Sequence, residues 1–332
     1  MNLEQIYIGL DTHRETIHGT ALDKNGGIIK SNAFPNTREA LQDFVKDFPT
    51  WNTTIAIEAC NFWRGCHKIL KEIGYIVKLA NPVICHKIAH EKKTDKVDSK
   101  ILADLTRVNY LPEVYIPSDE INALRDLTRH KMHFTRFKVR TQNKIKSCLS
   151  RNGISYEVDL WNKEGLQWLK ELKNYEIDSF LSLYQLISKE EDIIKKKIDK
   201  VAKSKKETTL LETIPGIGYF GATLIFAEIG DIKRFPTVKY LHAYAGVAPG
   251  IYQSGTKTRM PSRKSVNYWL KWIVMQCAGR VALKNIKPNK LRNYYLRIKD
   301  KKGWKTARKA TARKMLTIIW FMLNKNIPYR ES

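Results

Sequence analysis

A tight-turn signal between two β-rich stretches constrains the fold of the first hundred residues more than any other feature. The segment KNGG (24–27) separates TIHGTALD from GIIKSNAF, and an Asn-Gly pair between such stretches is a strong signal for a β-hairpin. A strand with alternating apolar residues (6–11) precedes it. An amphipathic helix (36–48) capped by Asn36 or Thr37, a β-branched strand (53–59), a helix (62–73) and a strand (75–81) follow. This order predicts a mixed sheet in an α/β layer.

The rest of the chain is predicted to be mainly helical. Residues 118–152 predict a long basic helix, and residues 174–205 a second one, in which apolar residues recur from Phe180 to Val201 and are interrupted by Glu191. Two long helices with a short connection predict a coiled-coil hairpin, and an ordinary buried helix pair is the alternative because the seam is short. We therefore expect an α/β domain (1–112), a long helical segment (113–206) and a mainly helical C-terminal domain (207–332).

The charge of the chain indicates a polyanionic partner. Lys and Arg number 59 against 33 Asp and Glu, which gives a net charge of +26, and this favours nucleic acid or an anionic membrane. No apolar run is long enough to span a membrane, and the N-terminus lacks the layout of a signal peptide. Residues 257–314 hold 19 basic residues and one acid, interleaved with Tyr and Trp. We interpret this stretch as a nucleic-acid surface, with a solvated helix face as the alternative.

The cysteines and histidines predict neither disulfides nor zinc. The cysteine number is odd and no CxxC pair occurs, so we expect free thiols in a reducing cytoplasm; they are Cys60, Cys66, Cys85, Cys148 and Cys277. His86 and His90 have the spacing of helix ligands, but Lys87 stands where a zinc protease motif requires Glu.

Four acids form the candidate catalytic constellation. Asp95 and Asp98 are three apart at the start of a predicted helix, so they share one face. Asp11 ends the first predicted strand and Glu58 lies late in another, so all four carboxylates can converge. Carboxylates this close repel one another unless cations lie between them, and oxygen ligands suit Mg²⁺ or Mn²⁺. Two such ions would clamp the oxygens of an in-line phosphoryl transfer.

Alternatives remain for the acids of the predicted helix. Taken alone, Asp95 and Asp98 fit helix capping and pairing with the helix dipole. Asp104 lies two turns further along, and we expect an outward, structural role for it. Lys93 and Lys96 would reduce the repulsion between the acids and contact the DNA backbone.

A glycine-rich turn is a second candidate for contacts with nucleic acid. PGIG (215–218) lies between two apolar helical stretches, as in a helix–hairpin–helix. Gly216 and Gly218 would allow backbone N–H groups to approach a phosphate at the start of the next helix. A tight turn that only packs two helices is the alternative.

Taken together and in this order, several motifs resemble one known family. IYIGLDTH, AIEAC and KTDKVDSKILADL resemble the Asp-Glu-Asp-Asp motif of the insertion-sequence-110 family of transposases, which includes the Piv-type DNA invertases. LLETIPGIGYFGATLIFAEIGDIKRFPTVKYLHAYAGVAPGIYQSG resembles the transposase domain of that family and ends in its serine motif. The resemblance spans residues 1–328 and implies an N-terminal domain with the RuvC-like (RNase H-like) fold.

The resemblance also implies an activity. Asp11, Glu58, Asp95 and Asp98 would hold the metals, and Ser254 would be the nucleophile of a DNA recombinase. Members are implied to be guided by a structured non-coding bridge RNA, whose loops pair with target and donor DNA. Homodimers would join into a homotetramer, with the acids of one subunit and the serine of another in each active site. The protein would then act in the bacterial cytoplasm, on the nucleoid.

The serine motif can also be interpreted from physical chemistry. Ser254 lies between Gly250 and Gly255, in a loop that can approach a phosphate, although most loop serines have no such role. No histidine with catalytic spacing is near, so a metal–carboxylate site must activate the hydroxyl. Basic residues around it would contact the flanking phosphates; they are Lys257, Arg259, Arg263 and Lys264.

One stretch departs from the pattern of the family. Ser265 stands where a glycine is expected and Lys271 where arginine is usual, so Ser262 and Ser265 become rival hydroxyls.

Two other functions stay open. One is a hydrolytic nuclease or Holliday-junction resolvase without a covalent intermediate, and the other is a non-enzymatic nucleic-acid-binding protein. No glycine-rich nucleotide loop is present, which agrees with strand transfer without ATP.

Overall fold

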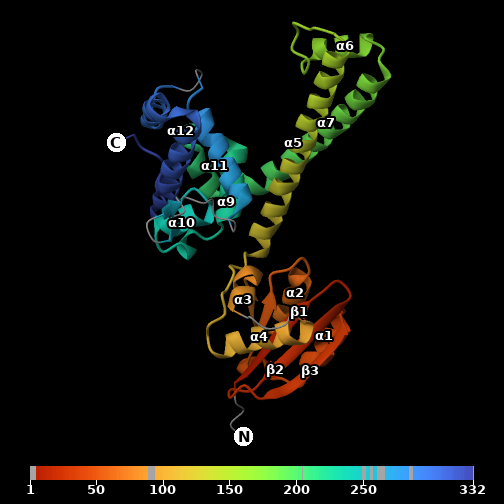
Figure 1. Cartoon of the computed structure of the whole chain (residues 1–332), viewed down its shortest axis with the longest axis vertical. Helices are drawn as coiled ribbons and strands as arrows, with labels where there is room; N and C mark the ends of the chain where they lie inside the picture. The colour runs from red at the N-terminus through yellow and green to blue at the C-terminus, as the bar shows by residue number, and fades with distance from the viewer. Residues whose placement is uncertain are drawn as a thin grey trace. The chain divides into compact units, whose positions relative to one another are not determined.

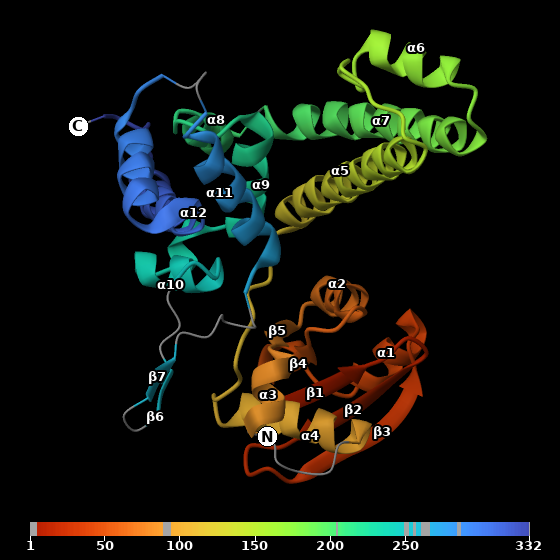
Figure 2. The same cartoon turned by 45° about the horizontal axis from the view of Figure 1, so that its top comes forward.

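The computed structural model describes residues 5–88, 94–203, 205–248, 252–254, 257–259, 266–283 and 287–331. The chain forms two compact units, Met1–Ile116 and Pro117–Ser332 (Figures 1 and 2). The first unit is mixed α/β and the second is mostly helical, which confirms the fold class at this level. The division of the second unit near residue 206 stays a prediction.

A five-stranded sheet forms the centre of the first unit. Its strands are β1 (Ile6–Thr12), β2 (Thr16–Leu22), β3 (Ile28–Pro35), β4 (Thr53–Glu58) and β5 (Ile76–Ala80). They lie in the order β3-β2-β1-β4-β5. β1, β2 and β3 are antiparallel neighbours, whereas β4 is parallel to both β1 and β5. The predicted hairpin at 24–27 therefore joins β2 to β3, and the mixed sheet is confirmed.

Helices cover both faces of this sheet. α1 (Arg38–Val45) and α2 (Trp63–Ile73) bury one face in a core that includes Leu41, Phe44 and Leu70. A short 3₁₀ turn, η1 (Thr50–Asn52), precedes β4. α4 (Asp95–Arg107) packs on the opposite face, where Leu102 and Leu105 contact the small residues of β4 and β5. α3 (Pro82–Ile88) follows β5 (Figure 1).

The ends of these helices follow the capping chemistry of the sequence. Thr37 is the N-cap of α1, since its hydroxyl accepts a hydrogen bond from the Ala40 amide. Gly74 ends α2 with φ 106°, a left-handed conformation that favours glycine. Of the two predicted caps for α1, the structure uses Thr37.

Two long helices open the second unit. α5 (Asp119–Arg151) and α7 (Tyr175–Ala202) lie side by side, and α6 (Lys163–Glu171) lies near their far end (Figure 1). Tyr184, Ile187, Ile194 and Ile198 of the predicted seam are buried, whereas Phe180 and Val201 are only partly buried. Leu181 and Ala202 are buried beside them, because the apolar stripe of α7 is rotated slightly from the predicted one.

The acid that interrupts this seam has partners on α5. Glu191 accepts hydrogen bonds from Thr135 (2.5 Å), Lys131 (3.2 Å) and Lys138 (3.3 Å). Burial alone would raise the pKa of Glu191, but the Thr135 hydrogen bond and the two lysine charges outweigh burial and lower the pKa. The interruption of the apolar pattern is therefore an ion-pair contact between the two helices.

The remaining helices share one hydrophobic core, which contains one largely buried helix. They are α8 (Lys206–Glu212), α9 (Tyr219–Ile229), α10 (Val238–Tyr244), α11 (Tyr268–Arg280) and α12 (Lys290–Lys325), with the 3₁₀ turn η2 (Ile232–Arg234). Every residue of α9 from Gly221 to Ile229 is buried, which explains a sequence that is apolar except for Thr223 and Glu228. α12 is kinked at Gly303, where φ is 77°.

No helix among the described residues is both long and apolar enough to cross a bilayer.

Candidate active site and nucleic-acid interface

Two of the predicted acids lie at the same edge of the sheet. β1 and β4 run parallel and pair Leu10 with Ile57, so Asp11 and Glu58 follow at neighbouring strand ends. Side chains alternate along a strand, so Asp11 points to the same face as Gly9, which lies against α4. Glu58 shares its face with Ala56, which is packed with Leu102 of α4. Both acids therefore lie on the face that α4 covers.

The other two acids occupy the first turn of α4. Asp95 is its first residue and Asp98 lies one turn further. The N-cap is Thr94, whose hydroxyl accepts a hydrogen bond from the Val97 amide at 3.3 Å. Capping, which the sequence left open for the two aspartates, is therefore provided by Thr94.

One imidazole joins the acid of β1 to the acid of α4. His13 Nε2 lies 3.2 Å from Asp11 Oδ2 and 3.4 Å from Asp95 Oδ1. These three side chains have ligand atoms within 4.8 Å of one another, as a metal site requires. Glu58 and Asp98 are not members of this group of three among the described residues. The sequence predicts four acids and does not single out His13.

The electrostatics of this group favour a cation. Burial raises the pKa of Asp11, the charges of Asp95 and Asp98 raise it further, and His13 opposes the rise. Within the described part of the chain, the ion pairs of Asp11 and Asp95 involve this histidine and no lysine or arginine. A buried carboxylate with like charges nearby is stabilised by a divalent cation, and oxygen donors suit Mg²⁺ or Mn²⁺. The residues present therefore fit such an ion.

Glu58 lies beside a different histidine. Its side chain is 16% exposed, and its Oε1 is 3.7 Å from His86 Nε2. Burial, followed by the Glu58 charge, raises the pKa of the neighbouring Cys85 thiol to about 11. His90, the second histidine of the rejected zinc pattern, lies outside the described residues.

A second histidine that the sequence pattern does not reveal lies next to Asp11. His18 of β2 pairs with Asp11 across the antiparallel ladder, and its Nδ1 is 2.9 Å from the Ser99 hydroxyl of α4. Burial lowers the pKa of His18, although the charges of Asp95 and Asp11 act in the opposite direction. The pairing of His18 with Asp11 depends on the register between β1 and β2, so the sequence pattern alone does not reveal it.

Asp104 lies away from this group. It is bonded to Arg107 of the same helix, with Arg107 Nη2 at 2.7 Å from its carboxylate, and its side chain is 49% exposed. This is a surface ion pair between residues one turn apart.

The candidate nucleophile lies in a short hairpin. β6 (Tyr252–Ser254) and β7 (Lys257–Arg259) are antiparallel, and Ser254 pairs with Lys257 next to the turn. The sequence predicts a loop here, and the structure gives Ser254 a strand-end backbone instead. Other predicted residues of this region and one near the acids lie outside the described residues; they are Ser262, Arg263, Lys264, Ser265 and Lys93.

The glycines of the PGIG turn differ in their surroundings. Gly216 has φ 86°, and a Cβ on it would come within 2.7 Å of the Val281 side chain and 2.8 Å of the Cys277 carbonyl oxygen. A packing role is therefore sufficient to explain Gly216. Gly218 is exposed at the start of α9, and Arg280 is the nearest side chain to a Cβ built on it, at 4.0 Å.

A basic groove follows α5. A cavity of about 570 Å³ is lined by residues of α5 and by Trp272 of α11, among them Arg136, Arg140 and Lys144. The Arg136 guanidinium lies over the rings of Tyr268 and Trp269, at 5.1 and 4.7 Å from their centroids. Cations beside aromatic rings suit the phosphates and bases of nucleic acid, so this groove is a candidate interface. Lys96, on α4 of the other unit, is exposed.

Comparisons with known proteins agree with these features. A transposase domain model of the IS110 type with a DEDD motif matches residues 8–153, and the model described as "Transposase IS116/IS110/IS902 family" matches residues 208–296. The chain is 25% identical to the transposase for insertion sequence element IS1328 of Yersinia enterocolitica, over 82% of each chain. It is 24% identical to the transposase for IS1111A of Coxiella burnetii, over 83% of this chain and 79% of the relative. It is also 24% identical to the pilin gene-inverting protein of Moraxella bovis, over 76% and 75%.

Proposed function

The chain belongs to the IS110 family of insertion-sequence transposases, and from this premise we propose that it recombines DNA through a covalent phosphoserine intermediate. The proposal assigns Asp11, Glu58, Asp95 and Asp98 to a divalent metal site and Ser254 to the attack on phosphorus. The observation that carries the metal site is the approach of Asp11 and Asp95, from elements 84 residues apart in sequence, to the same imidazole.

The acids would hold Mg²⁺ or Mn²⁺ on the α4 face of the sheet. The order of the strands, with an antiparallel β3-β2-β1 sheet extended by parallel β4 and β5, supports a RuvC-like fold for this unit. A bound divalent ion supplies charge stabilisation at the scissile phosphate and favours the deprotonated form of an attacking hydroxyl. His13 lies where it can accept or donate a proton beside Asp11 and Asp95.

Ser254 would conserve the energy of the phosphodiester bond. Its Oγ forms a bond to phosphorus, the bond from phosphorus to one strand oxygen breaks, the serine proton leaves, and the departing oxygen gains a proton. A hydroxyl of the partner strand then reverses these steps and releases the serine. One bond is exchanged for another of the same kind at each step, so the reaction needs no nucleotide cofactor.

The positive charge of the chain supports an RNA partner in addition to DNA. We propose that a structured guide RNA pairs with target and donor DNA and that the protein binds its backbone, partly along the α5 groove. Homodimers would combine as a homotetramer, so that the acids of one subunit act with Ser254 of another. Such an arrangement explains how two units with separate cores share one reaction.

A reconstituted reaction tests this function. The full chain is mixed with the RNA transcribed from the sequence flanking its gene and with both DNA substrates, and recombinant junctions are counted by sequencing. We expect junctions only with Mg²⁺ or Mn²⁺ and only with the RNA. Junctions formed equally well in EDTA would contradict the metal site, and junctions formed without RNA would contradict the guide. Cleavage that leaves only free ends would favour the hydrolytic nuclease.

A further inference from the structure

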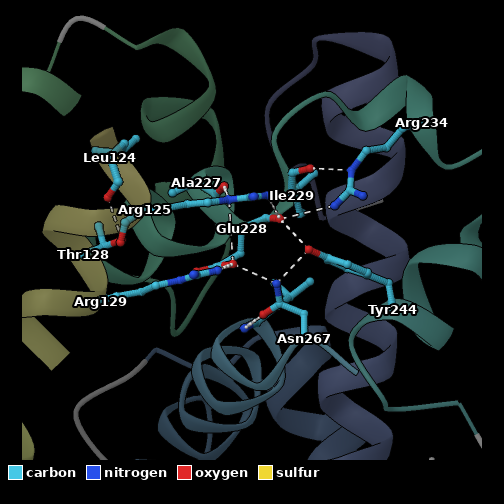
Figure 3. A network of polar contacts seen from close by, with 11 residues as sticks. Leu124, Arg125, Thr128, Arg129, Ala227, Glu228, Ile229, Arg234, Tyr244 and Asn267 are labelled. Carbon is cyan, nitrogen blue, oxygen red and sulfur yellow. Dashed lines mark hydrogen bonds and ion pairs between the residues drawn. The ribbon is translucent and has the colours of Figure 1, made fainter. Parts of the chain in front are cut away.

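A fully buried carboxylate lies at the centre of a polar network in the second unit (Figure 3). Glu228 of α9 has no exposed surface. Arg129 of α5 donates two hydrogen bonds to its carboxylate oxygens, each at 2.7 Å. Arg125 donates to the Ala227 carbonyl at 2.7 Å and to the Glu228 carbonyl at 2.9 Å. Two arginines from one helix therefore hold Glu228, Arg129 at its carboxylate and Arg125 at the adjacent backbone carbonyls.

The chain between Tyr244 and Asn267, which includes Ser254, is called the serine segment. The same carboxylate accepts a hydrogen bond from Asn267, the residue at the end of this segment. Asn267 Nδ2 lies 2.8 Å from Glu228 Oε2 and 2.8 Å from the Tyr244 hydroxyl. Its Oδ1 accepts from the Leu270 amide at 2.8 Å, as the N-cap of α11. Since both ends of this side-chain amide are bonded, its orientation is fixed, with oxygen toward the helix and nitrogen toward Glu228.

The two ends of the serine segment meet at this network. Tyr244 is the last residue of α10, and the backbone N–H of Asn267 donates to its carbonyl at 2.7 Å. The Tyr244 hydroxyl donates to the Glu228 carbonyl at 3.3 Å. Gly246, with φ 65°, lies so close to Val266 that a Cβ there would come within 2.8 Å of its side chain. The chain between these residues, which includes Ser254, therefore leaves and returns at one fixed point.

Stability alone does not account for this arrangement. A buried ion pair loses hydration, and apolar residues of similar volume often stabilise a fold as well or better. Burial by itself would lower the pKa of Arg129, but the hydrogen bonds and charge of Glu228 outweigh burial and raise the pKa. Unlike an apolar core, the network fixes the orientation of its side chains, because each hydrogen bond constrains the geometry of both partners.

We propose that Glu228, Arg129 and Asn267 are positioning residues that hold the base of the serine segment so that Ser254 presents its hydroxyl to the scissile phosphate. The inference rests on the proposed role of Ser254 and adds residues that set its placement. A displacement of about 1 Å at a reacting group lowers a rate about 100-fold, so a fixed base has a direct effect on the covalent step. The α5 groove lies outside this segment, so we expect binding of nucleic acid to change far less than the covalent step.

A polarity swap tests the contact between Glu228 and Asn267. Asn267→Asp keeps the α11 cap but sets two carboxylates against each other. Glu228→Gln added to it restores one acid and one amide, with donor and acceptor exchanged. Because Arg129 Nη2 donates to the same Oε2 atom as Asn267, the exchange loses one hydrogen bond to Arg129 and the rescue is partial. Thr223→Val is the matched control, because Thr223 lies on the same helix, is fully buried and has its hydroxyl bonded to the Tyr219 carbonyl.

The full chain with guide RNA and both DNAs is assayed for the protein–DNA adduct. We expect Asn267→Asp to lower the adduct rate at saturating DNA about 100-fold, with the half-saturating DNA concentration changed less than about 2-fold. The double variant should regain at least about 10-fold, and Thr223→Val should stay within about 2-fold of wild type. Trypsin cleavage at 257–264 should be faster in the single variant than in the double variant.

The outcomes distinguish a failure of this inference from a failure of the proposed function on which it rests. If the wild-type protein forms no adduct at Ser254, the proposed function fails. If the wild type forms it and Asn267→Asp forms it as fast, the inference is overturned. It is equally overturned if the double variant is no better than the single one. Should Asn267→Asp not fold, Tyr244→Phe serves instead, since it removes two hydrogen bonds but keeps the ring packed on Phe235; an unchanged adduct rate in that variant overturns the inference.

Discussion

Gly9 of β1 lies so close to Ser99 of α4 that a Cβ atom on Gly9 would overlap the Ser99 carbonyl oxygen. This contact sets the distance between the sheet and the helix that carries Asp95 and Asp98. Two hydrogen bonds to the Ser99 hydroxyl, with His18 at 2.9 Å and Thr20 at 2.8 Å, fix the helix along β2. The position of the acid group therefore depends on a residue that bears no side chain.

Gly9→Ala should lower the free energy of unfolding by about 2 kcal/mol or more, because the methyl group must displace the α4 backbone. Gly65→Ala is the control, since a Cβ on Gly65, within α2, meets nothing within 4 Å. That change should be neutral or stabilise the protein by about 0.5–1 kcal/mol. Urea unfolding of both variants measures the difference. A Gly9→Ala protein as stable as wild type would contradict the close packing.

The sequence predicted the elements better than it predicted their contacts. The hairpin at 24–27, a helix cap at Asn36 or Thr37 and the long helices could be predicted because turn residues and apolar spacing are local signals. His13 and His18 were missed as partners of Asp11, because their proximity depends on strand register and on how closely α4 packs. Such features depend on tertiary contacts between distant segments, which a local pattern does not encode.

The partners of Glu228 could not be predicted from the sequence for the same reason. Within FAEIG it reads as one polar residue in an apolar helix, and its partners Arg129 and Asn267 lie 99 and 39 residues away in the sequence. A buried acid in a helix predicts that some cationic partner exists. The packing of α5, α9 and α11 alone identifies Arg129 as that partner. The same packing brings Asn267 to the same carboxylate.

Replacement of any one of Asp11, Glu58, Asp95 and Asp98 by Ala should abolish metal-dependent recombination, with a loss of at least about 100-fold, because the acids act as a unit around the cation. RNA binding should be unchanged. Asp104→Ala is the matched control on the same helix, and since it removes only a surface ion pair it should change activity little. Junction counts and RNA affinity are measured in parallel. A fully active Asp98→Ala protein would exclude a shared site of four acids.

The stability of the second unit should depend on pH through His242. Burial lowers the pKa of His242 below its ordinary value of 6.5, and its Nε2 lies 3.1 Å from the Thr317 hydroxyl of α12. Below pH 6.5 the unfolded chain binds a proton that the folded chain does not, so stability falls as the pH falls through that value. His242→Gln should remove this part of the slope. Urea midpoints from pH 5 to 8 for both proteins measure it, and parallel curves would contradict it.

Affinity for RNA should fall steeply with salt, and the α5 groove should carry part of that dependence. Changing Arg136, Arg140 and Lys144 to Gln should reduce the slope of log affinity against log salt by about 1 for each phosphate that the variant no longer neutralises. The control changes the same charge on α2, at the exposed residues Arg64, Lys68 and Lys71. Filter binding across a salt series gives both slopes. Equal slopes for the two triple variants would place the RNA elsewhere.

Ser254→Ala should separate strand transfer from hydrolysis. If Ser254 attacks phosphorus, one strand end remains bonded to the protein and rejoining needs no cofactor; if water attacks, a free end appears and the bond energy is lost. The variant, assembled with guide RNA and both DNAs, should therefore bind as wild type does but form neither adduct nor recombinant junction. Ser262→Ala and Ser265→Ala, which remove the rival hydroxyls, should retain both.

A denaturing gel of labelled DNA detects the adduct, and mass analysis of the attached peptide locates it. An adduct at residue 262 or 265 would reassign the nucleophile, whereas metal-dependent cleavage without adduct, unaffected by Ser254→Ala, would identify a hydrolytic nuclease.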